Sequence, residues 1–285
     1  MADTGAYERP GSLARALALM SSRSYRPLAG GTDLYPATGA RALRGDILDL
    51  SRLDELKGLD LTSAGLRIGA CATWADIAQA VLPPALACLQ EAAHEVGGRQ
   101  IQNAATVGGN LCNASPAADG VPPLLALDAE VELAAADGVR RLPLAEFIAG
   151  PRKTVLGPGQ LLTAILIPRR SLMGRSRFVK LGARKYLVIS IASAAVRLVE
   201  REGRVAEARI AVGACSAVAR RLTGVEAALG GVPLSQAAAS VRDGDVALAL
   251  DPLDDIRASA TYRAAAAAEL IRRAVSQLAT GGADG

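Results

Sequence analysis

Apolar and polar positions along the chain predict a mixed first half and a second half in which strands precede helices. Leucines at helical spacing predict a helix over residues 12–20, with Ser12 as its N-cap. A helix is also expected from Thr73 to Ala80, where Pro83 and Pro84 end it. Short apolar or alternating runs predict strands at residues 26–29, 46–50 and 66–70.

The middle of the chain contains a long segment without periodicity. Residues 97–119 follow neither helical nor strand spacing, so we expect an irregular loop, and loops of this length are usually functional. After it, the pattern predicts a helix at 122–128, a hairpin around Asp137 and Gly138, and an apolar strand at 161–167. This order indicates a second group of strands and helices.

The composition changes at residue 169, and we place a domain boundary near residues 172–176. Seven cations and no acid occur in the segment that contains Arg169, Arg170, Arg175, Arg177, Lys180, Arg184 and Lys185. Strands are then predicted at 177–181, 191–199 and 206–214, with Gly203 in the last turn. Helical segments follow at 223–229, 235–241 and 256–278. Strands followed by a block of helices indicate an α+β fold.

Composition and charge narrow the possible functions. The chain has 285 residues, enough for two domains, and its net charge of +4 gives no reason to expect nucleic acid. No apolar run approaches the roughly 20 residues of a membrane span, and no secretory signal is visible at the N-terminus. Four scattered cysteines form no metal-ligand pattern and suit a reducing cytoplasm as small buried residues: Cys71, Cys88, Cys112 and Cys215.

Two glycine-rich motifs carry the candidate chemistry. The first motif is Leu28–Tyr35 (LAGGTDLY), and the second is Ala105–Pro116 (ATVGGNLCNASP) with Asp119 just beyond it. Glycine lets the backbone approach a ligand closely, and successive N–H groups form a concavity that holds an anion. Neutral donors that do not repel phosphate accompany them: Thr32, Thr106, Asn110, Asn113 and Ser115. Together the motifs predict a site for the two ends of a dinucleotide.

These motifs, followed by the segment 180–191 (KLGARKYLVISI), resemble the FAD-binding medium subunit of the molybdenum hydroxylases. That family includes the xanthine dehydrogenases and the carbon monoxide dehydrogenases, and the resemblance covers nearly the whole chain. It implies a two-lobed PCMH-type FAD-binding domain at 1–172, with lobes at about 1–58 and 59–172. It further implies a C-terminal domain at 176–280, formed by a three-stranded antiparallel sheet and a three-helix bundle.

The resemblance also implies cofactors and partners. FAD is expected in this chain, while the molybdopterin cofactor and [2Fe-2S] clusters are expected on a large and a small partner subunit, in a dimer of heterotrimers. Electrons would come from the clusters and leave to NAD+ or another acceptor. The same resemblance implies the cofactor-binding residues Leu28, Ala29, Gly30, Gly31, Thr32, Asp33, Leu34, Tyr35, Thr106, Gly108, Gly109, Asn110, Asn113, Asp119, Leu161 and Lys180.

Individual roles within this set differ, and some have alternatives. The first motif would wrap the pyrophosphate, whereas Asp33, which would repel phosphate, is expected to cap the following helical turn. Asp119 would accept from the ribose or form an Asx turn before Gly120. Lys180 would lie near the flavin or on the surface. Leu161 would pack on the cofactor, with an ordinary core position as the alternative and Leu162 as its rival.

No constellation for hydrolysis accompanies the motifs. His94 is the single histidine and lies in a helical stretch away from any serine motif. Trp74 is expected in the core, while Tyr35 and Tyr186 could flank the flavin ring. The basic segment is interpreted as an exposed surface, a docking face for an acidic partner or an attractor of NAD phosphates. We therefore expect an electron-transfer subunit; a stand-alone flavin oxidase or reductase and a non-catalytic scaffold are the alternatives.

Overall fold

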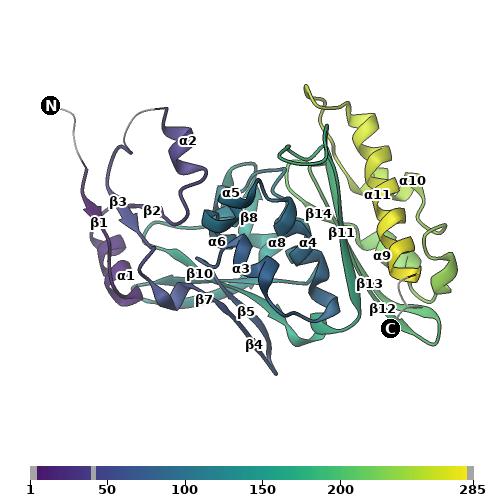
Figure 1. The fold of residues 1–285 in the computed structure, drawn as a ribbon, viewed down its shortest axis with the longest axis horizontal. Coiled ribbons are helices and arrows are strands. Elements are labelled where there is room, and N and C mark those ends of the chain that lie inside the picture. The colour runs from purple at the N-terminus through teal and green to yellow at the C-terminus, as the bar shows by residue number, and fades with distance from the viewer. Residues whose placement is uncertain (1–4, 40–42, 281–285) are drawn as a thin grey trace.

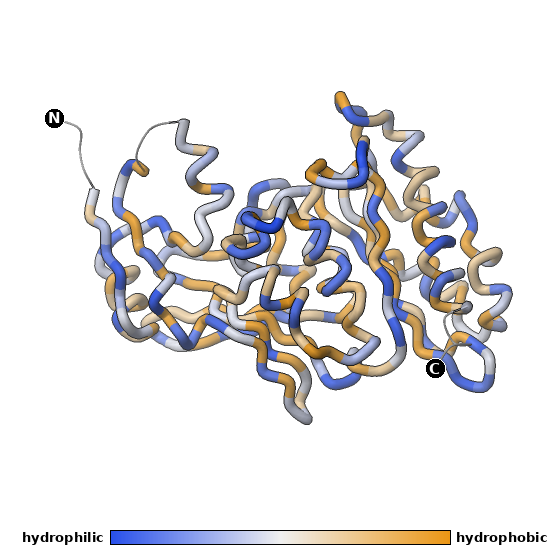
Figure 2. The backbone as a smooth tube through the Cα atoms, in the orientation of Figure 1, coloured by the Kyte–Doolittle hydropathy of each residue, from blue (hydrophilic) through white to orange (hydrophobic). Residues whose placement is uncertain are grey.

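The computed structural model describes residues 5–39 and 43–280. Three main sheets follow one another along the long axis of the molecule, from the N-terminal strands to the C-terminal helices (Figure 1). Hydrophobic residues concentrate along the strands of the second and third sheets (Figure 2). No helix within the described ranges is long and apolar enough to cross a membrane.

The first sheet is parallel and small, with strand order β1-β3-β2. Its strands are β1 (Tyr7–Glu8), β2 (Arg26–Leu28) and β3 (Ile47–Asp49), and its helices are α1 (Leu13–Ser22) and α2 (Leu34–Thr38). The predicted N-cap of α1 is confirmed, since the Ser12 side chain accepts the N–H of Arg15 at 3.3 Å. The first motif lies between β2 and α2.

The central sheet is antiparallel, with strand order β4-β5-β10-β6-β7. Its strands are β4 (Leu59–Thr62), β5 (Gly65–Gly69), β6 (Glu130–Ala135), β7 (Gly138–Pro143) and β10 (Leu161–Pro168). Helices on one side of it (Figure 1) include α3 (Trp74–Gln79), α4 (Ala87–Glu95) and α8 (Leu144–Phe147). α7 (Val121–Ala126) contacts the strands of the C-terminal sheet, and a small hairpin, β8 (Ile148–Gly150) and β9 (Lys153–Thr154), follows α8. Thr73 forms a capping box with Asp76, which confirms the predicted start of α3.

The irregular loop expected at 97–119 is largely wrong. The segment contains two short helices, α5 (Arg99–Ala104) and α6 (Val107–Asn113). Neither is long enough to show a helical period in the sequence. Bonds to the rest of the fold hold α6 in place, because the N–H groups of Val107 and Gly108 donate to Ala72 O and Ala70 O, each at 2.9 Å.

The C-terminal sheet is antiparallel and has four strands rather than the expected three. Its strands, in order across the sheet, are β11 (Arg175–Leu181), β12 (Ala192–Arg201), β13 (Arg204–Gly213) and β14 (Arg220–Arg221). β14 was not predicted because two arginines show no strand pattern; pairing with Ala211 and Val212 makes them a strand. The predicted turn is confirmed, with Glu202 and Gly203 at φ of 52° and 72°.

Alternate residues of the C-terminal sheet join two different hydrophobic cores. Ala195 and Ala211 face the core of the central sheet and its helices, together with Phe178. Ala194 and Val196 face the opposite core, beneath the C-terminal helices. The two faces of the C-terminal sheet therefore pack against two different hydrophobic cores, one in each half of the molecule.

The C-terminal helices differ in part from the prediction. They are α9 (Thr223–Leu229), α10 (Asp243–Ala249) and α11 (Ala260–Thr280). The helix expected at 235–241 is wrong, since only a short 3-10 turn at Leu234–Gln236 forms there; α10 starts later, with Asp243 and Asp245 in its first turn. α11 starts at 260 rather than 256 because Ser259 Oγ accepts the N–H of Tyr262 at 3.2 Å.

Candidate functional site

The first motif offers a row of unused backbone donors. None of the N–H groups of residues 29–33 donates to a backbone carbonyl within the described ranges, whereas the next bond of the motif runs from Tyr35 N to Gly31 O at 3.0 Å. Adjacent free N–H groups form an anion-binding concavity. Asp33 occupies the N-cap position of α2 but its side chain makes no capping bond, so the capping role predicted for Asp33 is wrong.

Gly30 lets the first motif lie against the boundary between α5 and the second motif, and Gly31 lets the first motif fold on itself. A Cβ on Gly30 would stand 1.8 Å from Ala104 O and 3.1 Å from Ala105 Cα. Gly31 has a φ of +72°, and its Cβ would stand 2.7 Å from the ring of Tyr35. The structure thus brings the two motifs, about seventy residues apart in sequence, side by side.

The second motif starts α6 and uses most of its own donors. Thr106 Oγ1 accepts the N–H of Gly109 at 3.1 Å, and the N–H of Gly108 donates to Ala70 O at 2.9 Å. Its glycine N–H groups are therefore not free for an anion, unlike those of the first motif. Asn110 Oδ1 is buried and has no partner within the described residues, so a ligand donor would satisfy it.

Asn113 and Leu161 lie at the margins of this arrangement. Asn113 Oδ1 accepts from the guanidinium of Arg152, which occupies that amide oxygen. Leu161 is buried in the small core beside the first sheet, with Leu48 and Leu50. Leu162, its rival, packs beneath the second motif, since a Cβ on Gly108 would stand 2.9 Å from Leu162 Cδ2.

Asp119 and Lys180 form a buried ion pair that joins the central helices to the C-terminal sheet. Lys180 Nζ donates to Asp119 Oδ2 at 2.7 Å and to Glu95 O at 3.3 Å, and Ser190 Oγ donates to Asp119 Oδ1 at 2.5 Å. Burial raises the pKa of Asp119 above its ordinary value, although Lys180 and Ser190 oppose that rise. The side chain of Lys180 is only 6% exposed, so the surface alternative for Lys180 is wrong. Among the described residues the Asp119 carboxylate accepts from Lys180 and Ser190 and from no neighbouring N–H, so the Asx-turn alternative is wrong as well.

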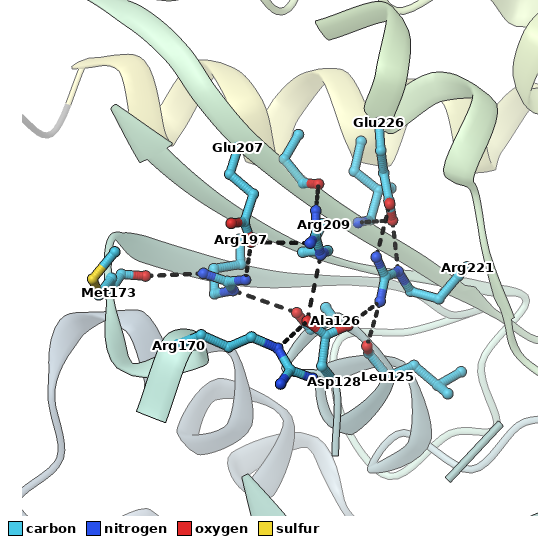
Figure 3. Close-up of polar contacts among 12 residues, drawn as sticks. Leu125, Ala126, Asp128, Arg170, Met173, Arg197, Glu207, Arg209, Arg221 and Glu226 are labelled. Atoms are coloured by element: carbon cyan, nitrogen blue, oxygen red, sulfur yellow. Dashed lines mark hydrogen bonds and ion pairs between the residues drawn. The ribbon is translucent and has the colours of Figure 1, made fainter. Parts of the chain in front are cut away.

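A second ion-pair cluster binds the far end of α7 to the same sheet (Figure 3). Asp128, at φ of 51°, lies 2.6 Å from Arg221 Nη1, 3.4 Å from Arg209 Nε and 3.7 Å from Arg170 Nε. Burial acts to raise the pKa of Asp128, but the hydrogen bond and charge of Arg221, with Arg209 and Arg170, outweigh it and hold the pKa below its ordinary value. Arg221 also binds both carboxylate oxygens of Glu226.

Two arginines of the C-terminal sheet also cap α7. Arg221 Nη1 donates to Leu125 O at 3.1 Å, and Arg197 Nε donates to Ala126 O at 3.5 Å (Figure 3). Cations at a helix C-terminus are favourable because they complement its dipole. Sequence reasoning missed these residues; the one available signal was Arg197, a charge inside the apolar run of a predicted strand.

The scarce side chains have mixed environments. Trp74 is buried as predicted, whereas Tyr35 and Tyr186 are exposed. Cys88 is buried, and burial raises the pKa of its thiol to about 12. Cys112 is exposed, contrary to the expected burial. Within the part of the chain that the structure describes, no group of His, Cys, Asp and Glu residues could hold a metal ion.

The arrangement has close counterparts among known proteins. A family model described as the FAD binding domain in molybdopterin dehydrogenase matches residues 2–170, and a model of the CO dehydrogenase flavoprotein C-terminal domain matches residues 177–278. The glyceraldehyde dehydrogenase medium chain of Sulfolobus acidocaldarius is 30% identical, with 96% of this chain and 98% of that one covered. The xanthine dehydrogenase FAD-binding subunit of Escherichia coli is also 30% identical, with 97% of each chain covered.

Solved structures agree with the sequence matches. The reconstituted CO dehydrogenase of Oligotropha carboxidovorans contains a chain that superposes with a TM-score of 0.89 at 29% identity, covering 98% of this chain and 99% of that one. The match extends over both the glycine motifs and the C-terminal sheet. Family models, relatives and structures thus agree with the resemblance read from the motifs, and the chain belongs to the family of FAD-binding medium subunits of the molybdenum hydroxylases.

Proposed function

We propose that this chain is the electron-transfer subunit of a molybdenum hydroxylase complex, which takes electrons from [2Fe-2S] clusters of a partner and passes them to NAD+ or another acceptor. The carrying observation is the row of free N–H groups at residues 29–33, set against the second motif. Bound FAD would supply the exchange of single electrons with the clusters and of electron pairs with the acceptor. The chain's residues need only hold, orient and electrostatically tune the cofactor.

The described residues fit a dinucleotide. The N–H groups of residues 29–33 would hold the pyrophosphate, and Gly30 lets this segment approach Ala104 more closely than a residue with a side chain could. Asn110 Oδ1, buried without a partner among the described residues, would accept a donor of the cofactor. A carboxylate retains acceptor capacity after two hydrogen bonds, so Asp119 would still accept from a ribose hydroxyl.

The other residues of the predicted set have supporting places in this proposal. Lys180 would bring positive charge toward the flavin, and its charge favours the cofactor's reduced, anionic form. Thr106, Gly108 and Gly109 would build the start of α6 that faces the first motif. Asn113, whose amide oxygen accepts from Arg152, and Leu161, which packs in the core beside the first sheet, would support the site from its margin.

The proposal includes an assembly and a domain division. We place an FAD-binding domain at 1–172, with lobes divided near 58, and a C-terminal domain at 176–280. Partners would be a large molybdopterin subunit and a small [2Fe-2S] subunit, in a dimer of heterotrimers. The relatives named as medium chains support such an assembly. The free thiols of the described residues are compatible with work in the cytoplasm.

The test is electron transfer in the co-expressed complex. The full chain is purified with its genomic partners, the clusters are reduced under anaerobic conditions, and flavin absorbance is followed before and after NAD+ is added. Bleaching that depends on the partner supports the proposal, and reoxidation by NAD+ identifies the acceptor. Bound FAD that the reduced partner does not bleach would contradict the proposal. Turnover of a small molecule by the chain alone would instead support a stand-alone oxidase or reductase.

A further inference from the structure

Ser190 lies outside both glycine motifs yet contacts the candidate cofactor site. We propose that Ser190 is a positioning residue that orients the Asp119 carboxylate for FAD, so that the C-terminal sheet completes a site begun by the glycine motifs. The inference rests on the proposed function. It concerns how this chain's own residues prepare the carboxylate.

The geometry fixes the carboxylate from two directions. Ser190 Oγ holds Asp119 Oδ1 at 2.5 Å, and Lys180 Nζ holds Oδ2 at 2.7 Å. Ser190 is 1% exposed and Asp119 is 9% exposed, so water does not substitute for either donor. With one donor on each oxygen, the carboxylate plane cannot rotate freely, and its remaining lone pairs keep one direction.

The sheet, not the loop around Asp119, determines this orientation. Lys180 belongs to β11, and Ser190 stands two residues before β12. The N–H of Ile191 donates to Leu181 O at 2.8 Å, which closes the base of the exposed segment 182–189 between them. Both donors to Asp119 are therefore attached where the end of β11 pairs with the residues that lead into β12.

The C-terminal end of α7, the helix that follows Asp119, is also held by the C-terminal sheet. α7 begins two residues after Asp119 and ends two residues before Asp128, which Arg221 binds at 2.6 Å. Both ends of the helix are thus bound by residues of the C-terminal half. Removal of the Ser190 hydroxyl would leave α7 in place and release only the carboxylate.

A matched pair of serine variants separates positioning from stability. Ser176 is also a buried serine whose hydroxyl joins the C-terminal sheet to the central helices, since its Oγ accepts the N–H of Cys88 at 2.9 Å. It does not contact Asp119. FAD affinity of the full chain is measured by quenching of flavin fluorescence, and thermal unfolding is measured without FAD.

Ser190→Ala is expected to raise the dissociation constant for FAD about tenfold, because a hydrogen bond to a charged group is lost. Ser176→Ala is expected to lower thermal stability while FAD affinity stays within about twofold of wild type. In an Asp119→Ala background, Ser190→Ala should change FAD affinity by less than about twofold, because the group it orients is gone. Ser190→Cys, close in volume and a weak donor, should act in the same direction as Ser190→Ala.

The outcomes distinguish this inference from the proposed function. If wild type binds FAD but Ser190→Ala and Ser190→Cys bind it as tightly as Ser176→Ala does, Ser190 does not position the site. An equal effect of Ser190→Ala with and without the Asp119 carboxylate would also overturn the inference, because the serine would then act by another route. If wild type itself binds no FAD, alone or with its partners, both this inference and the proposed function fail.

Discussion

The contact of Gly30 with the end of α5 makes a quantitative prediction. In Gly30→Ala, the new Cβ would stand 1.8 Å from Ala104 O and 2.6 Å from Ala104 C, whereas real Cβ contacts essentially never fall below 3.0 Å. Both opposing atoms belong to the backbone, so no side-chain rotation relieves the clash. The two motifs must separate by roughly 1 Å, and overpacking of this kind costs about 1–3 kcal/mol of folding free energy.

The same displacement should weaken the cofactor. The donors of residues 29–33 and the acceptor Asn110 Oδ1 would move apart, and hydrogen bonds weaken steeply outside their narrow distance range. We expect the dissociation constant of FAD to rise at least tenfold, the equivalent of about 1.4 kcal/mol. Gly30 does not have a left-handed φ, so the effect would come from the clash and not from backbone strain.

Urea unfolding and FAD titration of the full chain measure the two effects. Gly11→Ala is the matched control, because a Cβ there would meet nothing within 4 Å and its φ is ordinary. We expect this control to lie within about 0.5 kcal/mol of wild type in stability, with unchanged FAD affinity. The reasoning is refuted if Gly30→Ala matches Gly11→Ala in both measurements.

Three further predictions concern the ion pairs and one turn. Asp128→Asn should be less stable than wild type at neutral pH, as measured by urea unfolding. Because the pKa of Asp128 in the folded protein lies below its ordinary value, this difference in stability should shrink as pH falls below about 4. Lys180→Met should lower the free energy of unfolding by about 3–5 kcal/mol at neutral pH, since the Asp119 carboxylate would remain as a buried charge without its ion-pair partner. This loss of stability should shrink in acid, because Asp119, whose pKa is raised, becomes protonated there. Gly203→Ala should cost about 1 kcal/mol in thermal unfolding because φ there is 72°.

Each of these has a control and a contrary result. For Asp128→Asn, the exposed Asp60→Asn should show no such pH trend, and a constant deficit across pH would argue against the Arg221 pair. For Lys180→Met, the exposed Lys153→Met should be near neutral, and equal losses would contradict the buried pair. For Gly203→Ala, the control is Gly224→Ala, where a Cβ meets nothing within 4 Å; equal stabilities would remove the conformational argument.

Elements with local signals could be predicted from the sequence, and those that depend on distant contacts could not. Ser12 and Thr73 each accept a hydrogen bond from the residue three positions later. The local sequence was therefore enough to predict where these two helices start. β14 has no such signal, because its two arginines become a strand only by pairing with β13. The shift of the predicted helix from 235–241 to α10 has the same cause, since alanine-rich spacing alone does not choose between adjacent segments.

The candidate site shows the same division. The glycines of both motifs were visible in sequence, but their mutual contact arises from Gly30 and Ala104, which no local pattern links. Asp119 and Lys180 were singled out by resemblance, yet their direct pairing joins positions 61 residues apart. Ser190 belongs to the segment 180–191 that resembles the family, but nothing in the local sequence links its hydroxyl to Asp119, 71 residues earlier.

The reach of the Asp119 contacts has a consequence for synthesis of the chain. Lys180 and Ser190 follow Asp119 by 61 and 71 residues. At about 5–20 residues per second, the second donor is added roughly 4–14 s after the carboxylate. Both glycine motifs therefore leave the ribosome well before the site is complete. A chain released before residue 190 carries the recognisable motifs but lacks a donor to the Asp119 carboxylate, so translation must pass Ser190 before the site can be completed.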